Sequence, residues 1–171
     1  VGIKGVAMSS LAVYLVEKGY EVTGSDVEDI FPTDKILKEK NIIIKKGFSA
    51  NNIDKDYQVM IVTGAHGGRT NIEVQKAKEL GIPTYMHGEF LGSLMEGKFG
   101  ISIAGCHGKT TTSSLIAYLL YKGGFKPSYA IGTAEINGLG PAGHFGGGKI
   151  FVAEADEYMT CPNSDPTPRF M

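Results

Sequence analysis

The first hundred residues contain a helical stripe of apolar side chains, followed by short apolar runs that alternate with further helical segments. Between Val6 and Lys18, apolar side chains recur at the spacing of a buried helix face, and Gly19 follows this stripe. The further predicted helices are "DKILKEK", Asn71–Leu80 and "GEFLGSLME", and the predicted strands are "YEVTGSD", "NIII", "YQVMIVTGA" and "IPTYM". The opening Val1–Ile3 reads as the end of another strand running into a glycine turn. This order of strands and helices predicts a parallel sheet with helices on both faces.

A second unit is predicted to begin near Lys98. It opens with the apolar strand "FGISIAG", continues through a glycine turn into a helix over Thr111–Tyr121, and includes the later strand "KIFVAEADE". Glycine, 24 of 171 residues, clusters at 2–5, 64–68, 105–108 and 138–148, and these clusters predict loops. The closing "CPNSDPTPRFM" also predicts a polar loop, and we expect the chain to be a fragment of a longer protein.

Composition narrows the class of protein. Hydrophobic residues make up 42% of the chain and charged residues 20%, which is enough for a packed core. The net charge of −1 argues against a nucleic-acid partner. No apolar run reaches the roughly 18 residues of a membrane span, so we expect no membrane partner. Cys106 and Cys161 follow no metal or redox spacing, which favours a reduced, cytoplasmic setting.

The segment "GCHGKTTT", residues 105–112, has the context of a phosphate-binding loop. An apolar strand precedes it and a helix begins near Lys109, so backbone N–H groups and the helix dipole create an anion site. The loop is two residues shorter than the common G-x-x-x-x-G-K-[ST] pattern. The alternative is a simple helix start, but a lysine in a first helical turn is disfavoured by the dipole. We therefore predict a nucleotide site.

Carboxylates support this site. Glu154, Asp156 and Glu157 follow an apolar strand, and an acidic residue at such a position holds Mg²⁺ beside the loop hydroxyl in nucleotide-hydrolysing enzymes. Glu154 is best placed because it comes first after the apolar run. The fold class predicted from these patterns is α/β, with a Rossmann-like parallel-sheet domain over 1–97 and the incomplete beginning of a P-loop ATPase domain over 98–171.

The glycines at the start of the chain form a weaker motif. "VGIKGVAMSS" partly matches the dinucleotide pattern G-x-G-x-x-G/A, with Lys4 at the second glycine position and Ala7 at the third. Asp26 ends the second strand, where an acidic residue contacts ribose in dinucleotide enzymes. The pattern leaves two alternatives open, a tight strand–helix turn and an NAD-dependent oxidoreductase.

The motifs together resemble the Mur ligases, the ATP-dependent amide-forming enzymes of peptidoglycan synthesis. "GCHGKTTT" is similar to the family's shortened G-T-H-G-K-T-T-T, with Cys106 replacing threonine. "VAEADEY" resembles the family's E-A-D-E segment, and "GIKGVAMSSLA" resembles its G-I-G-G-x-G-M-S-x-L-A turn. The resemblance covers nearly the whole chain, although "YMTCPNSDPTPRF" departs from the S-D or Y-D that usually follows E-A-D-E.

This resemblance implies a three-domain enzyme that binds a UDP sugar on its first domain and ATP with Mg²⁺ on its second. The implied reaction joins L-alanine to UDP-N-acetylmuramate through an acyl phosphate, and the alternative acceptor is a recycled tripeptide. We expect this fragment alone to be inactive. A further alternative is a non-catalytic nucleotide-sugar-binding protein.

The resemblance also assigns roles to residues. Lys109 would be catalytic by neutralising the β- and γ-phosphates, and Thr110 with Glu154 would hold Mg²⁺. The implied ATP-binding residues are Gly105, Cys106, His107, Gly108, Lys109, Thr110 and Thr111. The implied UDP-sugar contacts are Lys4, Gly5, Val6, Ala7, Asp26, Thr63 and Gly64. His66 and His87 are either further substrate contacts or ordinary loop histidines.

Overall fold

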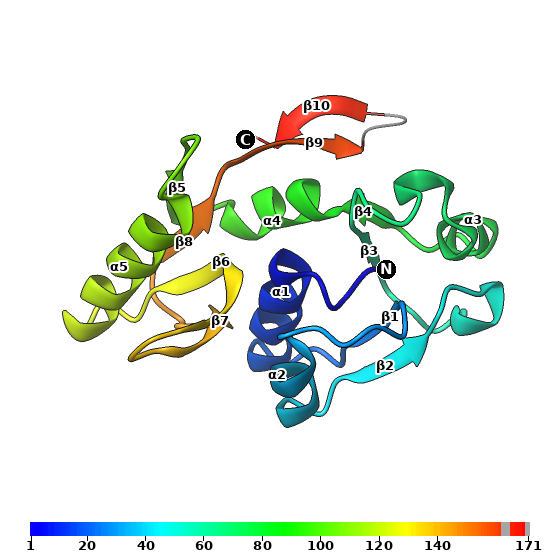
Figure 1. The fold of residues 1–171 in the computed structure, drawn as a ribbon, viewed down its shortest axis with the longest axis horizontal. Helices are drawn as coiled ribbons and strands as arrows, with labels where there is room; N and C mark the ends of the chain where they lie inside the picture. The colour runs from blue at the N-terminus through cyan, green and yellow to red at the C-terminus, as the bar shows by residue number, and fades with distance from the viewer. Residues whose placement is uncertain (162–164, 170–171) are drawn as a thin grey trace.

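Strands and helices alternate through the first half of the molecule (Figure 1). The computed structural model describes residues 1–161 and 165–169, with side chains up to Ala155. The strands of the first half are β1 (Thr23–Asp26), β2 (Ile43–Lys46), β3 (Met60–Val62) and β4 (Thr84–Met86). Its helices are α1 (Val6–Glu17), α2 (Asp34–Glu39), α3 (Ile72–Glu79) and α4 (His87–Met95), with 3₁₀ turns η1 (Ala50–Asn52) and η2 (Gly68–Thr70). The predicted helices are all present, and the strand predicted at "NIII" lies two residues later, as β2. The strand end predicted at Val1–Ile3 is not a strand in the structure, although the segment is hydrogen-bonded to residues of β1 and β3.

The first half contains two two-stranded sheets, together called the first sheet below, and both are parallel as predicted. β1 pairs with β2, and β3 pairs with β4, both in parallel register. The segment Val1–Ile3 joins the two pairs, because Gly2 N donates to Ser25 O at 2.9 Å and Thr63 N donates to Val1 O at 3.2 Å. The carboxyl ends of β1 and β3 therefore meet at the glycine turn that follows Ile3.

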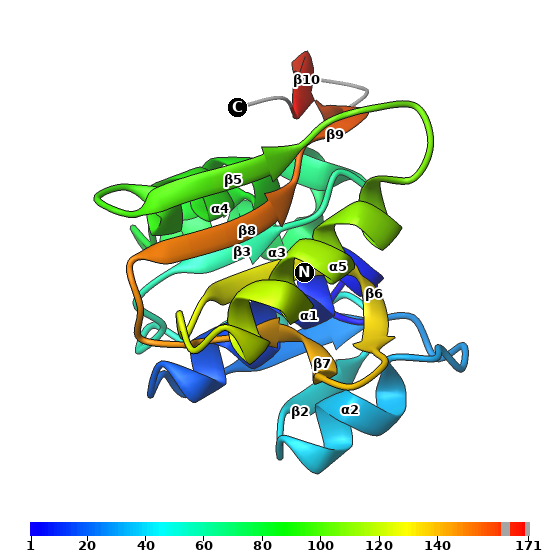
Figure 2. The same cartoon turned by 90° about the vertical axis from the view of Figure 1, so that its left-hand side faces the viewer.

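The second sheet has the order β5-β8-β6-β7. Its strands are β5 (Phe99–Ile103), β6 (Ser128–Ile136), β7 (Gly140–His144) and β8 (Ile150–Glu154), and α5 (Lys109–Lys122) follows β5. β8 runs parallel to both of its neighbours, whereas β7 is antiparallel to β6. In Figure 2, α5 lies toward the viewer and α4 lies behind β5 and β8.

Two loop predictions are wrong. β7 lies within the glycine cluster 138–148, because Gly138, with positive φ, lies in the short turn of a β6–β7 hairpin and Gly140 begins the second strand, paired with Ile136. The closing segment contains β10 (Asp165–Arg169), which pairs antiparallel with β9 (Asp156–Cys161). The side chains of Asp156, Glu157 and Cys161 lie outside the described residues.

The two sheets share a core through α1. Successive residues of β8 point to opposite faces of its sheet. Val152 packs with Ala117 of α5, whereas Phe151 and Ala153 pack with residues of α1 and α4. Figure 1 shows α1 between the β6–β7 hairpin and the first sheet. The first helix of the Rossmann-like half therefore belongs to both halves, and the division at residues 97 and 98 stays a prediction.

Candidate functional site: a phosphate loop facing a glycine turn

The loop between β5 and α5 has the backbone of a phosphate-binding turn. Gly105 and Gly108 have φ values of +146° and +78°, which a residue with a Cβ rarely adopts. Gly108 directly precedes α5, and the residues from Gly105 to Gly108 are exposed. The first N–H groups of a helix lack partners within it, so this exposed helix start favours an anion.

Lys109 is held over this loop. It is the first residue of α5, and its Nζ donates to Gly105 O at 2.9 Å. The lysine side chain thus curls back across the turn instead of extending along the helix. This places the ammonium on the same side as the loop, as a phosphate contact requires.

Thr110 and Glu154 come together as the sequence predicted. Thr110 Oγ1 donates to Glu154 Oε2 at 3.3 Å, although 43 residues separate them in the chain. Gly132 N donates to the other carboxylate oxygen at 3.0 Å and fixes its direction. A hydroxyl and a carboxylate oxygen are ligands that Mg²⁺ accepts, and Mg²⁺ sites of this kind take their remaining oxygens from phosphates and water. The residues present therefore fit a magnesium ion bound together with a nucleotide.

Sequence reasoning missed Gly132. It lies in β6, and no element is predicted from the sequence between the helix α5 and the glycine cluster at 138–148. The alternating apolar positions around "SYAIGTAEI" are the signal that could have revealed it.

The glycine turn lies at the carboxyl edge of the first sheet. Gly2 has a φ of +77°, and a Cβ there would lie 2.4 Å from Thr63 Cγ2, so only glycine fits beside Thr63. Gly5 precedes α1, which has no acidic residue in its first turn. Val6 is 41% exposed. The turn therefore lies against Thr63 at the end of β3, with the start of α1 directly after it. That these residues bind a UDP sugar stays a prediction.

Lys4 and Asp26 use their polar groups within the protein. Asp26, 1% exposed, accepts from Lys4 N at 2.7 Å and from Val27 N at 2.8 Å. Lys4 Nζ donates to Val27 O at 3.0 Å and to Asp29 O at 2.8 Å. Both residues therefore brace the glycine turn against the segment after β1. Direct contact of Lys4 or Asp26 with substrate stays a prediction.

The two histidines lie in different places. His66 follows β3, and its Nε2 lies 3.6 Å from Asp26 Oδ1 beside the glycine turn. His87 is the buried first residue of α4. Together with Ala7, Gly132 and Glu154, it lines a cavity of about 60 Å³ between α4, the start of α1 and the second sheet. His66 thus lies beside Gly2 of the turn, whereas His87 shares a cavity with Ala7 in the first turn of α1.

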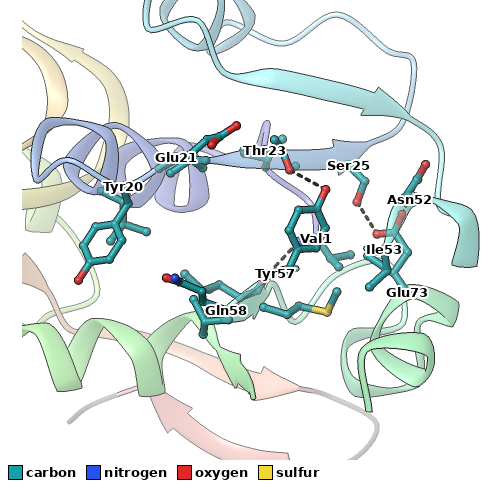
Figure 3. Close-up of a pocket in the computed structure, with 18 of the residues that line it drawn as sticks. Val1, Tyr20, Glu21, Thr23, Ser25, Asn52, Ile53, Tyr57, Gln58 and Glu73 are labelled. Atoms are coloured by element: carbon teal, nitrogen blue, oxygen red, sulfur yellow. Dashed lines mark hydrogen bonds between the residues drawn. The ribbon is translucent and has the colours of Figure 1, made fainter. Parts of the chain in front are cut away.

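A larger cavity of about 880 Å³ lies between β1 and β3 (Figure 3). Thr23 Oγ1 donates to Tyr57 OH at 3.1 Å across it, and α1 and α4 contribute apolar side chains to its walls. Its lining includes residues 19–25 and 56–61, which lie toward the amino ends of β1 and β3. Ligands of parallel α/β sheets bind at the carboxyl ends. We therefore place the candidate site at the glycine turn and not in this cavity.

The strand, glycine loop and helix, with Lys109 over the loop and the Thr110–Glu154 pair beside it, form the arrangement that is typical of P-loop nucleotide-binding proteins of the α/β class. The chain belongs to the Mur ligase family, because residues 1–99 match the family model described as "Mur ligase family, catalytic domain". No helix in the described part of the chain is long and apolar enough to cross a membrane.

Curated relatives agree with this membership. The UDP-N-acetylmuramate–L-alanine ligase of Carboxydothermus hydrogenoformans is 46% identical over 157 residues, which are 92% of this chain and 33% of the relative. The enzyme of the same name from Aquifex aeolicus is 41% identical over 92% of this chain and 34% of its own length. The chain thus spans about a third of the length of these relatives.

Solved structures show the same fold. The UDP-N-acetylmuramate:L-alanyl-gamma-D-glutamyl-meso-diaminopimelate ligase from Neisseria meningitides superposes with a TM-score of 0.83 and 28% identity. That match covers 98% of this chain and 54% of the other. The UDP-N-acetylmuramate–alanine ligase from Thermotoga maritima has a TM-score of 0.80 and 27% identity, over 91% of this chain and 36% of its own. The predicted α/β class and Rossmann-like first half are confirmed.

Proposed function

We propose that this chain is part of an ATP-dependent ligase that joins L-alanine to UDP-N-acetylmuramate in peptidoglycan synthesis. The observation that carries the proposal is the shortened phosphate loop, with Lys109 folded over it and Thr110 in contact with Glu154. The names of the 46% and 41% identical relatives support L-alanine, and not the tripeptide, as the acceptor. The use of ATP supports a cytoplasmic location.

The first step activates the sugar's carboxylate. A carboxylate oxygen attacks the γ-phosphorus of ATP, the bond to the β-phosphate oxygen breaks, and ADP leaves. Charge accumulates on the phosphate oxygens, so stabilisation of charge and alignment dominate this step. Lys109 and the N–H groups at the start of α5 would neutralise that charge. Thr110 and Glu154 would hold Mg²⁺, which adds positive charge at the same phosphates.

The second step forms the amide. The amine of L-alanine attacks the acyl carbon, its proton is lost, and the bond to phosphate breaks with inorganic phosphate as the leaving group. The first sheet contributes to both steps by binding the UDP part of the substrate at the glycine turn. Gly5, Val6 and Ala7 at the start of α1 would face the diphosphate, and Thr63 and Gly64 would border it.

The test uses the full-length protein with Mg-ATP and UDP-N-acetylmuramate. We expect ADP release that depends on L-alanine, and a product heavier than the nucleotide sugar by one alanine residue in mass spectrometry. Release that depends on the tripeptide and not on L-alanine would assign the related recycling reaction instead. Tight binding of the nucleotide sugar with no turnover for either acceptor would favour the non-catalytic binding protein.

A further inference from the structure

His66 is an imidazole fixed at the glycine turn, and the reaction steps above leave it without a role. A Cβ placed on Gly2 would lie 3.4 Å from His66 Cδ2, so the ring rests against the turn itself. The neighbouring Nε2 lies 3.6 Å from Asp26 Oδ1. The Nε2 edge of the ring therefore lies between a buried carboxylate and the turn where the diphosphate is proposed to bind.

Two further contacts hold His66 in this place. The Phe48 ring covers it, with centroids 4.9 Å apart and planes at 38°. Asn71 Nδ2 donates to His66 O at 2.9 Å. Asn71 also caps α3 by accepting from Glu73 N at 2.9 Å, so it links the backbone of His66 to the start of that helix. The backbone has a φ of +54°, which is uncommon for a residue with a Cβ.

We propose that His66 binds the diphosphate of the nucleotide sugar by donating a ring N–H to a phosphate oxygen. This proposal rests on the proposed function and adds a specificity-determining residue to it. The Asp26 carboxylate accepts from Lys4 N and Val27 N, and its Oδ1 also lies 3.6 Å from His66 Nε2, which fixes the direction of the ring. An imidazole carries at least one ring N–H that can donate to a phosphate oxygen.

The position distinguishes a phosphate contact from a contact with the uracil base. Phe48 occupies one face of the imidazole, so that face is not open to a stacked base. The Nε2 edge lies at the turn instead, beside the start of α1 that favours an anion. His66 therefore adds charge recognition to a turn where Lys4 Nζ is directed to the carbonyls of Val27 and Asp29.

The experiment measures dissociation constants of uridine, UMP, UDP and UDP-N-acetylmuramate for the full-length protein by calorimetry. The variants are His66→Asn and His66→Gly, because asparagine and glycine tolerate the left-handed backbone of this position and only the imidazole is lost. We expect UDP and UDP-N-acetylmuramate to bind about tenfold or more weakly to both variants, since a hydrogen bond to a charged group is removed. Uridine should bind within about twofold of the unaltered protein.

Each other outcome overturns a specific statement. Equal weakening for uridine and UDP would assign His66 to the base or to the shape of the site, and unchanged UDP binding would remove it from the site; either result overturns the proposal for His66 alone. If the unaltered protein binds no uridine ligand, the proposed function fails together with it. Melting temperatures of both variants, measured in parallel, show whether they fold.

Discussion

Lys4 stands where the Mur ligase sequence pattern has a glycine, and its side chain stabilises the turn through contacts within the protein. Its side chain is 10% exposed, and its ammonium lies 3.6 Å from Asp34 Oδ1 and 5.6 Å from the centre of the Phe31 ring. With the two carbonyl contacts, these groups replace the water that a buried ammonium loses. Lys4 thus holds the segment between β1 and α2 against the glycine turn.

Lys4→Met should therefore destabilise the protein. Methionine retains most of the apolar stem but leaves the carbonyls of Val27 and Asp29 without their donor, so we expect a loss of about 1–3 kcal/mol in the free energy of unfolding. The measurement is urea denaturation. Lys35→Met is the matched control, because the Lys35 side chain is 72% exposed and should change stability by no more than about 0.5 kcal/mol. Equal losses in both variants would contradict the bracing role of Lys4.

Glu17 joins α1 to the β6–β7 hairpin by charge. Its carboxylate lies 2.7 Å from His144 Nδ1, and it accepts from Lys40 Nζ at 2.6 Å and from Phe145 N at 3.1 Å. Burial alone would raise the pKa of Glu17, but these three partners outweigh it and lower the pKa to about 2 from an ordinary 4.5.

The lowered pKa gives stability a defined dependence on pH. The unfolded chain binds a proton to this carboxyl more tightly than the folded protein does, so the contribution of Glu17 is complete above pH 4.5 and is lost as the pH falls toward about 2. The difference in unfolding free energy between the unaltered protein and Glu17→Gln should therefore shrink across this range in denaturation curves. For Glu79→Gln, at a side chain 67% exposed, the difference should stay small at every pH. A constant difference for Glu17→Gln would contradict the ionic account.

At the scale of elements, the sequence predicts the helices and strands that have a regular spacing of apolar residues. The stripe in α1 and the apolar strands before glycine turns are set by local spacing, and each of them is present. The strand β7 was hidden because Gly143 within it serves close packing against α1 and not a loop. The internal contacts of Lys4 and Asp26 were hidden for another reason: spacing gives the position of a side chain along an element but not the groups that it meets.

The helix α5 combines a predicted anion site with a lysine that the loop holds in place. Lys109→Ala removes the ammonium while the Gly105 and Gly108 turn and the helix remain, so Mg-ATP should bind about tenfold or more weakly to the full-length variant. Lys122→Ala, at the exposed far end of the same helix, is the control and should leave affinity unchanged. The measurements are calorimetric titration with Mg-ATP and thermal melting. Unchanged affinity of Lys109→Ala with a normal melt would remove the loop from the ATP site.

At the scale of the whole molecule, α1 joins the two sheets. Ser10 Oγ donates to Ile131 O of β6 at 2.7 Å, and Leu11 and Tyr14 share a core cluster with Phe151 of β8. Through Ala12, the same helix belongs to a core cluster of the first half that also contains Leu37 of α2 and has Ile44 of β2 packed against it. Because one helix fills both cores, we expect the chain to unfold in one cooperative transition and not domain by domain.

The close approach of α1 to the hairpin gives the sharpest test of this shared core. A Cβ on Gly143 of β7 would lie 1.7 Å from Ser10 O, and backbone atoms on both sides leave little room to move. Gly143→Ala should therefore separate α1 from the hairpin and cost about 3 kcal/mol or more in the free energy of unfolding. Gly92→Ala in α4 is the matched control: no atom lies within 4 Å of its added methyl group, and alanine is favoured in a helix by about 1 kcal/mol. Both are measured by denaturation followed with circular dichroism. We expect one transition in each variant, shifted to lower denaturant for Gly143→Ala and unchanged or shifted slightly higher for Gly92→Ala. Equal stabilities would contradict the close packing, and two separate transitions in the unaltered chain would show that α1 does not join the halves into one cooperative unit.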